Sequence, residues 1–236
     1  ERAFGAAERR VETRFVSMTA PGPAKADPEH IVWTTGYRDP ELLGYVAGSM
    51  AHFGWVEVRR ATIFKRLAEV EEVYRLHDPS YMGDEKRKLL VEVMLDHLVD
   101  DFRIVVFYEN WMKARLLMEG VCIHKFKGAR SKELNKFLEQ PWSGTNIMVA
   151  GITDDEIART TVNMTRLLSK AYQVVIRMPA DVHAIVSKIN KRRNRLHFYT
   201  HNELGMGPGV VQEYRMLFDH IQHCRTQALG ELSILS

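Results

Sequence analysis

The spacing of apolar residues is the sequence feature that most constrains this fold. Apolar residues recur at intervals of three and four over long stretches, which places them on one face of an α-helix. The longest such pattern covers residues 84–119 and includes Leu95, Leu98, Phe102, Val105 and Val106. Strand-like alternation occurs only in the short segments 31–33 and 120–126. The pattern therefore predicts an all-α fold.

Helix boundaries are marked by residues that start or stop helices. Asp39 followed by Pro40 is typical of a helix start, and Gly120 of a helix end. We expect further helices over 56–77, 153–178, 180–202 and 210–232, separated by Pro79, Pro179 and the glycine-rich segment 205–209. Thr153 and Glu156 have the spacing of a capping box. These elements predict an α-helical bundle.

The N-terminal segment differs in composition from the remainder of the chain. Three prolines lie within residues 18–28, which is typical of a linker because proline removes a backbone donor and forces the preceding residue into extended conformations. We expect residues 1–29 to form an N-terminal arm and linker. Residues 30–236 are expected to form a single α-helical domain.

Composition excludes several classes of protein. The 236 residues contain only two cysteines, which excludes a disulfide framework and favours a cytoplasmic location. No apolar run approaches the roughly 18 uninterrupted residues of a transmembrane helix, so no membrane association is expected. The net charge is only +3, from 33 basic and 30 acidic residues, so polyanion binding would require local clustering of charge.

Such a cluster occurs late in the chain. Residues 188–195 contain no acidic residue and five basic ones, which are Lys188, Lys191, Arg192, Arg193 and Arg195. On a helix, Arg193 and Asn194 share a face with His197, and His201 continues that face one turn later. Histidine can accept and return a proton near neutral pH, whereas arginine can hold a phosphate and stabilise its developing charge. Asparagine can orient either partner. The cluster suits metal-independent RNA cleavage, in which a ribose hydroxyl attacks the adjacent phosphate.

This cluster, together with the helix that carries Glu109 and Lys113, resembles the HEPN superfamily. Its motif is an arginine, four to six residues and then a histidine, often accompanied by an acidic residue on an earlier helix. Arg192 and His197 have this spacing, and Glu109 fits the acidic position. The resemblance implies a catalytic set of Arg192, His197, Asn194 and Glu109. The substrate-binding set would comprise Arg193, Arg195, Lys188, Lys191, His201 and Lys113.

The resemblance also implies a setting for the activity. Many members of the superfamily are RNA-cutting toxins or antiviral effectors that act as dimers without a cofactor. We therefore expect a metal-independent endoribonuclease that forms a homodimer and binds RNA, with an antitoxin or a sensor protein as a further partner.

Several alternatives remain open. Asn194 follows Arg193 rather than Arg192, so either Arg192 is catalytic with Arg193 as its polar neighbour, or the pair is Arg195 and His201. A member with a decayed site, or a non-catalytic module that binds RNA, a nucleotide or a protein, is the competing interpretation. His197 and His201 also have zinc-ligand spacing, but they lack the intervening glutamate of the metalloprotease motif, and no metal is expected. Glu109 and Lys113 can also form a simple ion pair on the helix surface.

Overall fold

The structure is a computed structural model that describes residues 37, 40–75, 84–143, 146–147, 150–194 and 209–234. Most of these residues are helical, and the only sheet among them has two short strands, so the all-α prediction is confirmed. The arm predicted over 1–29 and the strand candidate at 31–33 lie outside the described residues. None of the helices in the described ranges is long and apolar enough to cross a membrane.

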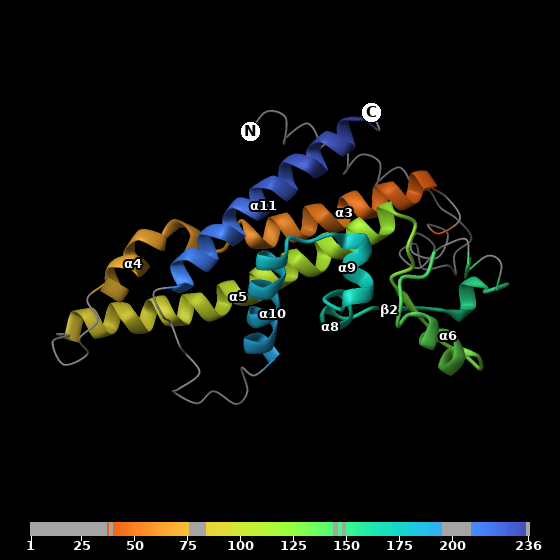
Figure 1. Cartoon of the computed structure of the whole chain (residues 1–236), viewed down its shortest axis with the longest axis horizontal. Coiled ribbons are helices and arrows are strands. Elements are labelled where there is room, and N and C mark those ends of the chain that lie inside the picture. The colour runs from red at the N-terminus through yellow and green to blue at the C-terminus, as the bar shows by residue number, and fades with distance from the viewer. Residues whose placement is uncertain are drawn as a thin grey trace, which may run out of the picture. The chain divides into compact units, whose positions relative to one another are not determined.

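The elements follow one another in a simple order (Figure 1). The α-helices are α3 (Pro40–Val58), α4 (Leu67–Arg75), α5 (Asp84–Met118), α6 (Ser131–Phe137), α8 (Met164–Leu167), α9 (Lys170–Ile176), α10 (Ala180–Asn194) and α11 (Gly209–Ile234). Two 3-10 helices, η2 (Ile63–Lys65) and η4 (Asp154–Glu156), and two strands, β1 (His124–Phe126) and β2 (Ile157–Thr161), complete the described elements.

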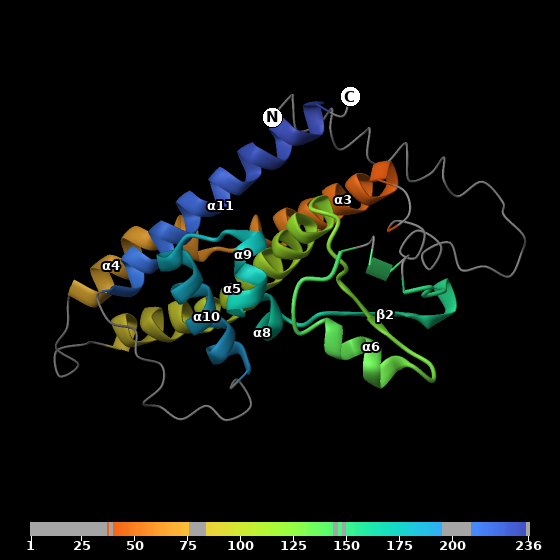
Figure 2. The same cartoon turned by 45° about the vertical axis from the view of Figure 1, so that its right-hand side comes forward.

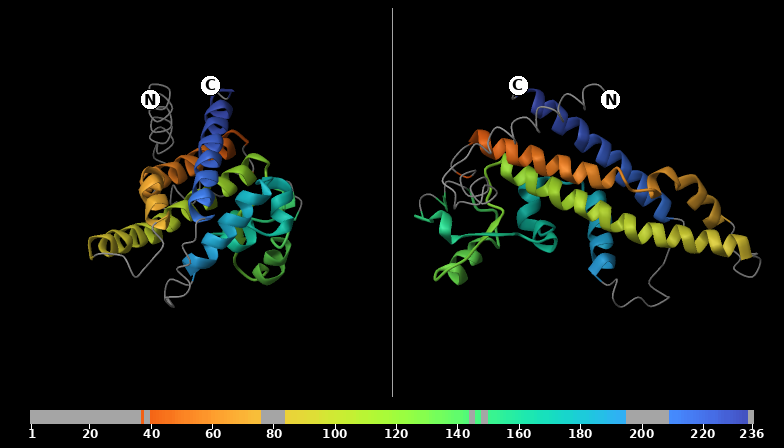
Figure 3. Two further views of the ribbon diagram at one scale, coloured as in Figure 1. Left: turned by 60° about the vertical axis from the view of Figure 1, so that its left-hand side comes forward. Right: turned by 180° about the vertical axis from the view of Figure 1, so that it is seen from behind.

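The chain divides into two compact units, each assembled from separate segments. Unit 1 comprises Glu1–His52, Glu109–Arg177 and Glu231–Ser236, and unit 2 comprises Phe53–Tyr108 and Met178–Gly230. Helix α5 contributes to both, and Figure 3 shows it as one unbroken helix. The single domain expected over 30–236 stays a prediction.

In unit 2, the apolar stripe predicted on α5 is buried only in part, because Val105 is buried but Phe102 is not. Phe102 is 52% exposed, whereas its neighbour Asp101 is buried, as are Asp100 and His97. At these positions the prediction is wrong because each buried carboxylate has hydrogen-bond donors that replace water, which makes its burial tolerable. Around these groups lie the apolar residues of the core, including Ile104, Val105, Val186, Ile189, Leu217 and Ile221.

The helix predicted over 56–77 is interrupted for a related reason. Helix α3 ends at Val58, and the chain turns before η2 and α4 begin. The Asp100 carboxylate accepts hydrogen bonds in this turn from the Thr62 hydroxyl at 3.0 Å and the Ile63 amide at 2.7 Å. The backbone amide of Ile63 thus has an acceptor that, in a continuous helix, would be a backbone carbonyl.

In unit 1, a two-stranded antiparallel ribbon replaces part of the helix predicted over 153–178 (Figure 2). Thr153 does begin a helical turn, because the Glu156 carboxylate accepts a hydrogen bond from its amide at 3.2 Å, but that turn is only η4. The next residues form β2, where Ile157 pairs with Phe126 and Thr161 with His124. β-branched residues in this segment fit a pleated ribbon better than a helix.

The predicted ends of other helices are confirmed. Helix α3 begins at Pro40, and α5 ends at Met118 just before Gly120. Gly120 has a φ of 69°, the left-handed conformation that glycine adopts without steric cost. Helix α10 is described as far as Asn194, so the remainder of the helix predicted over 180–202 lies outside the described residues.

Candidate functional site

Helix α10 of unit 2 carries the first residues of the predicted site. Pro179 precedes the helix, and the Asp181 carboxylate accepts a hydrogen bond at 2.8 Å from the amide of Val182. Val182, Ile185, Val186 and Ile189 recur at intervals of three and four on α10, and all four are buried. This buried stripe orients α10 within the unit and so fixes where its last turn, which carries Arg192, lies.

Arg192 forms a two-point contact with Asp101 of α5. Its Nε donates to Oδ2 of Asp101 at 3.0 Å, and its Nη2 donates to Oδ1 at 3.3 Å. The Arg192 side chain is 17% exposed and the Asp101 side chain is 3% exposed. Bidentate pairing of this kind fixes the plane of a guanidinium as well as its position.

Tyr214 of α11 joins the same carboxylate. Its hydroxyl donates a short hydrogen bond to Oδ1 of Asp101 and lies 3.3 Å from Nη2 of Arg192. Nδ1 of His97 lies 2.8 Å from the same hydroxyl. Because a phenol has one proton and gives it to Asp101, His97 must donate from Nδ1. Together Asp101, Arg192, Tyr214 and His97 form what we call the Asp101 network.

Burial controls the ionisation of the Asp101 network. Burial raises the pKa of Asp101 to about 6, although the Arg192 charge and the Tyr214 hydroxyl oppose the shift. Burial, and then the nearby charge of Arg192, lower the pKa of His97 to about 3. At neutral pH the network therefore holds an ionised Asp101, a charged Arg192 and a neutral His97.

Asp100 directs its carboxylate to a different set of partners. In addition to its bonds to Thr62 and Ile63, it accepts from Nη1 of Arg103 at 2.9 Å. Two adjacent buried carboxylates on α5 thus have separate donors, so their like charges are each compensated locally. Asp100 fixes the turn before α4, whereas Asp101 fixes the end of α10.

The other predicted residues on α10 have varied surroundings. Lys188 is paired with Glu213 of α11, with Nζ 2.7 Å from Oε1. Lys191 is exposed, and Arg193 is half-buried. Asn190 is buried, and its Oδ1 meets no hydrogen-bond partner among the residues that the structure describes. Lys188 is thus largely neutralised, while Lys191 keeps its charge available to solvent.

Glu109 and Lys113 lie on the part of α5 that belongs to unit 1. Nζ of Lys113 is 2.6 Å from Oε1 of Glu109, so the ion pair that their spacing allows is formed. Lys113 is buried, which makes this pair part of the packing of unit 1. The catalytic role predicted for Glu109 and the substrate-binding role predicted for Lys113 stay predictions.

The remaining predicted residues fall at or beyond the end of the described helix. Asn194 is the last residue of α10, and its backbone alone is described. Arg195, His197 and His201 lie outside the described residues. The assignment of His197, and the alternative pair of Arg195 and His201, therefore stay predictions.

Three members of the Asp101 network, namely Asp101, His97 and Tyr214, were not among the residues predicted from the sequence. A signal was available, because Asp100 and Asp101 are adjacent acids inside the largely apolar segment 98–108. His97 and Asp101 also lie four apart and so share a helix face. No spacing rule connects either residue with Tyr214, more than a hundred residues later.

No protein-family model matches this chain, and no curated protein or solved structure matches it either.

Arg192 has one nitrogen that its neighbours in the network do not engage. Asp101 and Tyr214 engage Nε and Nη2, and no described residue accepts a hydrogen bond from Nη1. A guanidinium held in this way can offer Nη1 to a phosphate oxygen without having to reorganise. Within the described part of the chain, this is the arrangement best suited to binding an anion.

Proposed function

We propose that this protein is a metal-independent endoribonuclease of the HEPN type. The observation that carries the proposal is the fixed guanidinium of Arg192 at the last turn of α10, five residues before His197. Preorganised positive charge is what a phosphoryl transfer requires, because charge builds on the phosphate oxygens in the transition state.

In the proposed reaction, the ribose 2′-hydroxyl attacks the adjacent phosphorus. A new bond forms between O2′ and phosphorus, and the bond from phosphorus to the 5′-oxygen of the next nucleotide breaks. His197 accepts the proton of the 2′-hydroxyl and returns it to the leaving 5′-oxygen. Nη1 of Arg192 stabilises the charge on the phosphate, and Asn194 orients the reacting groups. The products are a 2′,3′-cyclic phosphate and a free 5′-hydroxyl.

We place the neighbouring cations in substrate binding. Lys191 is exposed, and Arg193 is half-buried in the same turn of α10 as Arg192. Long basic side chains at such positions contact phosphates on either side of a cleaved bond. By the same resemblance, we propose that the enzyme acts in the cytoplasm as a homodimer, with full activity requiring both copies.

Cleavage of single-stranded RNA in the presence of EDTA tests the proposal. We expect His197→Ala to reduce cleavage by about 100-fold or more, because it removes the general acid–base. His201→Ala is the matched control, since it also removes one histidine of the same face. Loss of cleavage in His201→Ala but not in His197→Ala would move the site to Arg195 and His201. Cleavage that EDTA abolishes contradicts a metal-free mechanism.

Arg192 requires a control of its own, because its substitution also breaks the pair with Asp101. Tyr214→Phe disturbs the same network but keeps the Arg192 charge. We expect Arg192→Ala to lose cleavage and Tyr214→Phe to retain most of it, measured at a temperature where circular dichroism shows both variants folded. Equal losses in the two variants would mean that the network serves folding alone.

A non-catalytic RNA-binding module is the second candidate. The observation that favours it is that two nitrogens of Arg192 donate hydrogen bonds to Asp101. An arginine with a purely structural role is held in the same way. RNA binding that depends on Lys191 and Arg193, with no cleavage in any buffer, would identify this function instead.

A further inference from the structure

A second basic surface lies in unit 1, on residues that the proposed reaction does not use. Residues 127–136 contain four basic residues and one acidic residue, Glu133. The four are Lys127, Arg130, Lys132 and Lys136, and all are exposed. Ten residues with this balance carry as large an excess of positive charge as the whole chain does.

Most of this charge is not neutralised within the unit. Arg130 lies 3.2 Å from Oε1 of Glu156 and is paired. In the described part of the chain, no carboxylate forms an ion pair with Lys127, Lys132 or Lys136. Their charges are therefore available to an external anion.

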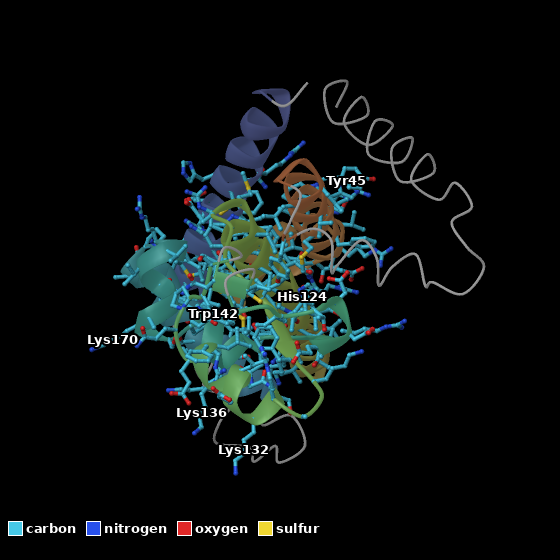
Figure 4. All side chains as sticks on the ribbon, turned by 90° about the vertical axis from the view of Figure 1, so that its right-hand side faces the viewer. Tyr45, His124, Lys132, Lys136, Trp142 and Lys170 are labelled. Atoms are coloured by element: carbon cyan, nitrogen blue, oxygen red, sulfur yellow. The ribbon has the colours of Figure 1, made fainter. Side chains whose placement is uncertain are left out.

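The packing of α6 turns two of these lysines outward. The Asn135 side chain accepts from the Phe126 amide at 2.9 Å and donates to the Phe126 carbonyl at 2.8 Å, which fixes one face of α6 against β1. Lys132 and Lys136 are four residues apart on a different face and extend away from the unit (Figure 4). Their spacing along the helix is about 6 Å, close to the distance between neighbouring phosphates of a single strand.

A series of three aromatic rings in contact ends at Phe137, the residue that follows Lys136 on α6. The buried Phe126 ring meets Trp142 edge-on at 5.7 Å, and Trp142 stacks on Phe137 at 4.9 Å with planes 18° apart. Phe137, next to Lys136 in the chain, is 47% exposed. A hydrogen bond of 2.7 Å from the Cys122 amide to the Trp142 carbonyl fixes the backbone that carries the middle ring.

We infer that this surface, formed by Lys127, Lys132, Lys136 and Phe137, binds single-stranded RNA. The lysines would contact phosphates, and an unpaired base would extend the series of aromatic rings by stacking on Phe137. Cations flanking an exposed aromatic ring are the usual means of holding single strands without sequence preference. An acidic protein would use the lysines but would not require the ring, and a duplex has no free base face to offer it.

The choice of RNA over DNA rests on the proposed function, whereas the mode of binding does not. As a docking surface remote in sequence from α10, it would increase the time that a substrate strand spends on the enzyme. Removing the surface should therefore raise KM for a long RNA more than for a dinucleotide, because a dinucleotide has no further nucleotides with which to occupy a second binding surface.

The test measures, by fluorescence anisotropy, the binding of a fluorescein-labelled 2′-O-methyl oligouridine of about 12 nucleotides to the full chain. The 2′-O-methyl group prevents the strand from being cut, so binding is measured whether or not the protein is a nuclease. We expect Lys132→Gln with Lys136→Gln to lower the slope of log Kd against log salt by about 1.4, which is about 0.7 for each phosphate that is no longer neutralised. Lys65→Glu, which changes the net charge equally at an exposed position in unit 2, should leave the slope nearly unchanged.

The ring is tested separately with Phe137→Leu, which keeps an apolar side chain on α6 while removing the stacking surface. We expect it to weaken binding about fivefold or more. Thermal unfolding of each variant checks that the fold is retained. Wild-type affinity of Phe137→Leu, equal binding of a duplex, or equal effects of the lysine pair and Lys65→Glu would each overturn the inference. Binding that passes these tests without any RNA cleavage would leave this inference standing and contradict the proposed nuclease.

Discussion

Arg192 and Asp101 meet side by side in unit 2, with Nε of the arginine 3.0 Å from Oδ2 of the aspartate and Nη2 3.3 Å from Oδ1. The contact joins the last turn of α10 to the middle of α5. It therefore fixes the helix end from which the predicted catalytic segment continues. Because the carboxylate is almost fully buried, it has few other partners that could replace the guanidinium.

Asp101→Ala should strongly destabilise unit 2. Removing the carboxylate leaves the buried charge of Arg192 without its partner, which typically costs about 3–5 kcal/mol. Urea denaturation measures the change in the free energy of unfolding. Asp96→Ala removes one partner of Arg66 that is itself 47% exposed, and it should cost less than about 1 kcal/mol.

The double variant Asp101→Ala with Arg192→Leu sharpens this prediction. With both charges removed, no ion is left buried, so much of the loss should be recovered. If the double variant is as unstable as Asp101→Ala alone, the cost arises from packing rather than from an unpaired charge.

The pH dependence of stability should change in Asp101→Asn. The pKa of Asp101 is raised to about 6 in the folded protein, so the folded state binds this proton more tightly than the unfolded state. This group therefore contributes stability at low pH that is lost as pH rises from about 4 to about 6. Asparagine has no such titration, so the variant should gain stability relative to wild type over this interval, by up to about 1.4 kcal/mol per pH unit.

Two histidines, the buried His97 and the half-buried His220, change stability in the opposite sense. The pKa of His97 is lowered to about 3 and that of His220 to about 4, both mainly by burial, so each contributes stability that increases as pH rises toward 6.5. These contributions are common to wild type and Asp101→Asn, and they cancel in the difference between the two. Chemical denaturation at intervals from pH 4 to pH 7 measures that difference, and a constant difference would refute the assigned role of Asp101.

The stripe of α10 shows what periodicity can predict. Val182, Ile185, Val186 and Ile189 lie on one face and are buried, as an apolar stripe on a helix should be. On α5 the same reasoning placed Val105 correctly but failed at two neighbouring positions. Phe102 is exposed there and Asp101 is buried, since the donors that compensate Asp101 come from helices far away in the sequence.

The candidate site was predictable only in part for the same reason. The basic residues of α10 are adjacent in the chain, so their clustering is visible without a structure. The orientation of Arg192 depends on Asp101, which is brought to it by tertiary packing. The capping box at Thr153 also led to a predicted helix that is too long. Only η4 forms after it, because the following residues pair with β1 as strand β2.

In unit 1, Tyr37→Phe should be unusually costly for the loss of one hydroxyl. That hydroxyl accepts from the amides of Ile123 at 2.7 Å and His124 at 3.2 Å. It lies 2.7 Å from Nδ1 of His124 and donates to it, because both amides already use it as an acceptor. Phenylalanine would leave these buried groups unpaired, at a cost of roughly 3 kcal/mol or more.

Tyr172→Phe is the matched control for this variant. The Tyr172 hydroxyl makes one hydrogen bond, to the carbonyl of Leu138 at 2.9 Å, and its loss should cost about 1 kcal/mol. Thermal unfolding of the two variants compares them directly. Similar midpoints would show that water takes over the role of the Tyr37 hydroxyl.

Arg192→Lys should separate charge from geometry in the proposed reaction. Lysine keeps the positive charge but cannot contact Asp101 at two points, so its ammonium group is not held in one orientation. We expect cleavage of single-stranded RNA, measured as kcat/KM in EDTA, to fall by about 10- to 100-fold, because small displacements of a catalytic charge are costly. Arg193→Lys is the adjacent control and should reduce cleavage much less, since Arg193 is assigned to substrate binding. The reverse ranking of the two variants would make Arg193 the catalytic arginine and leave Arg192 as the residue that fixes the end of α10.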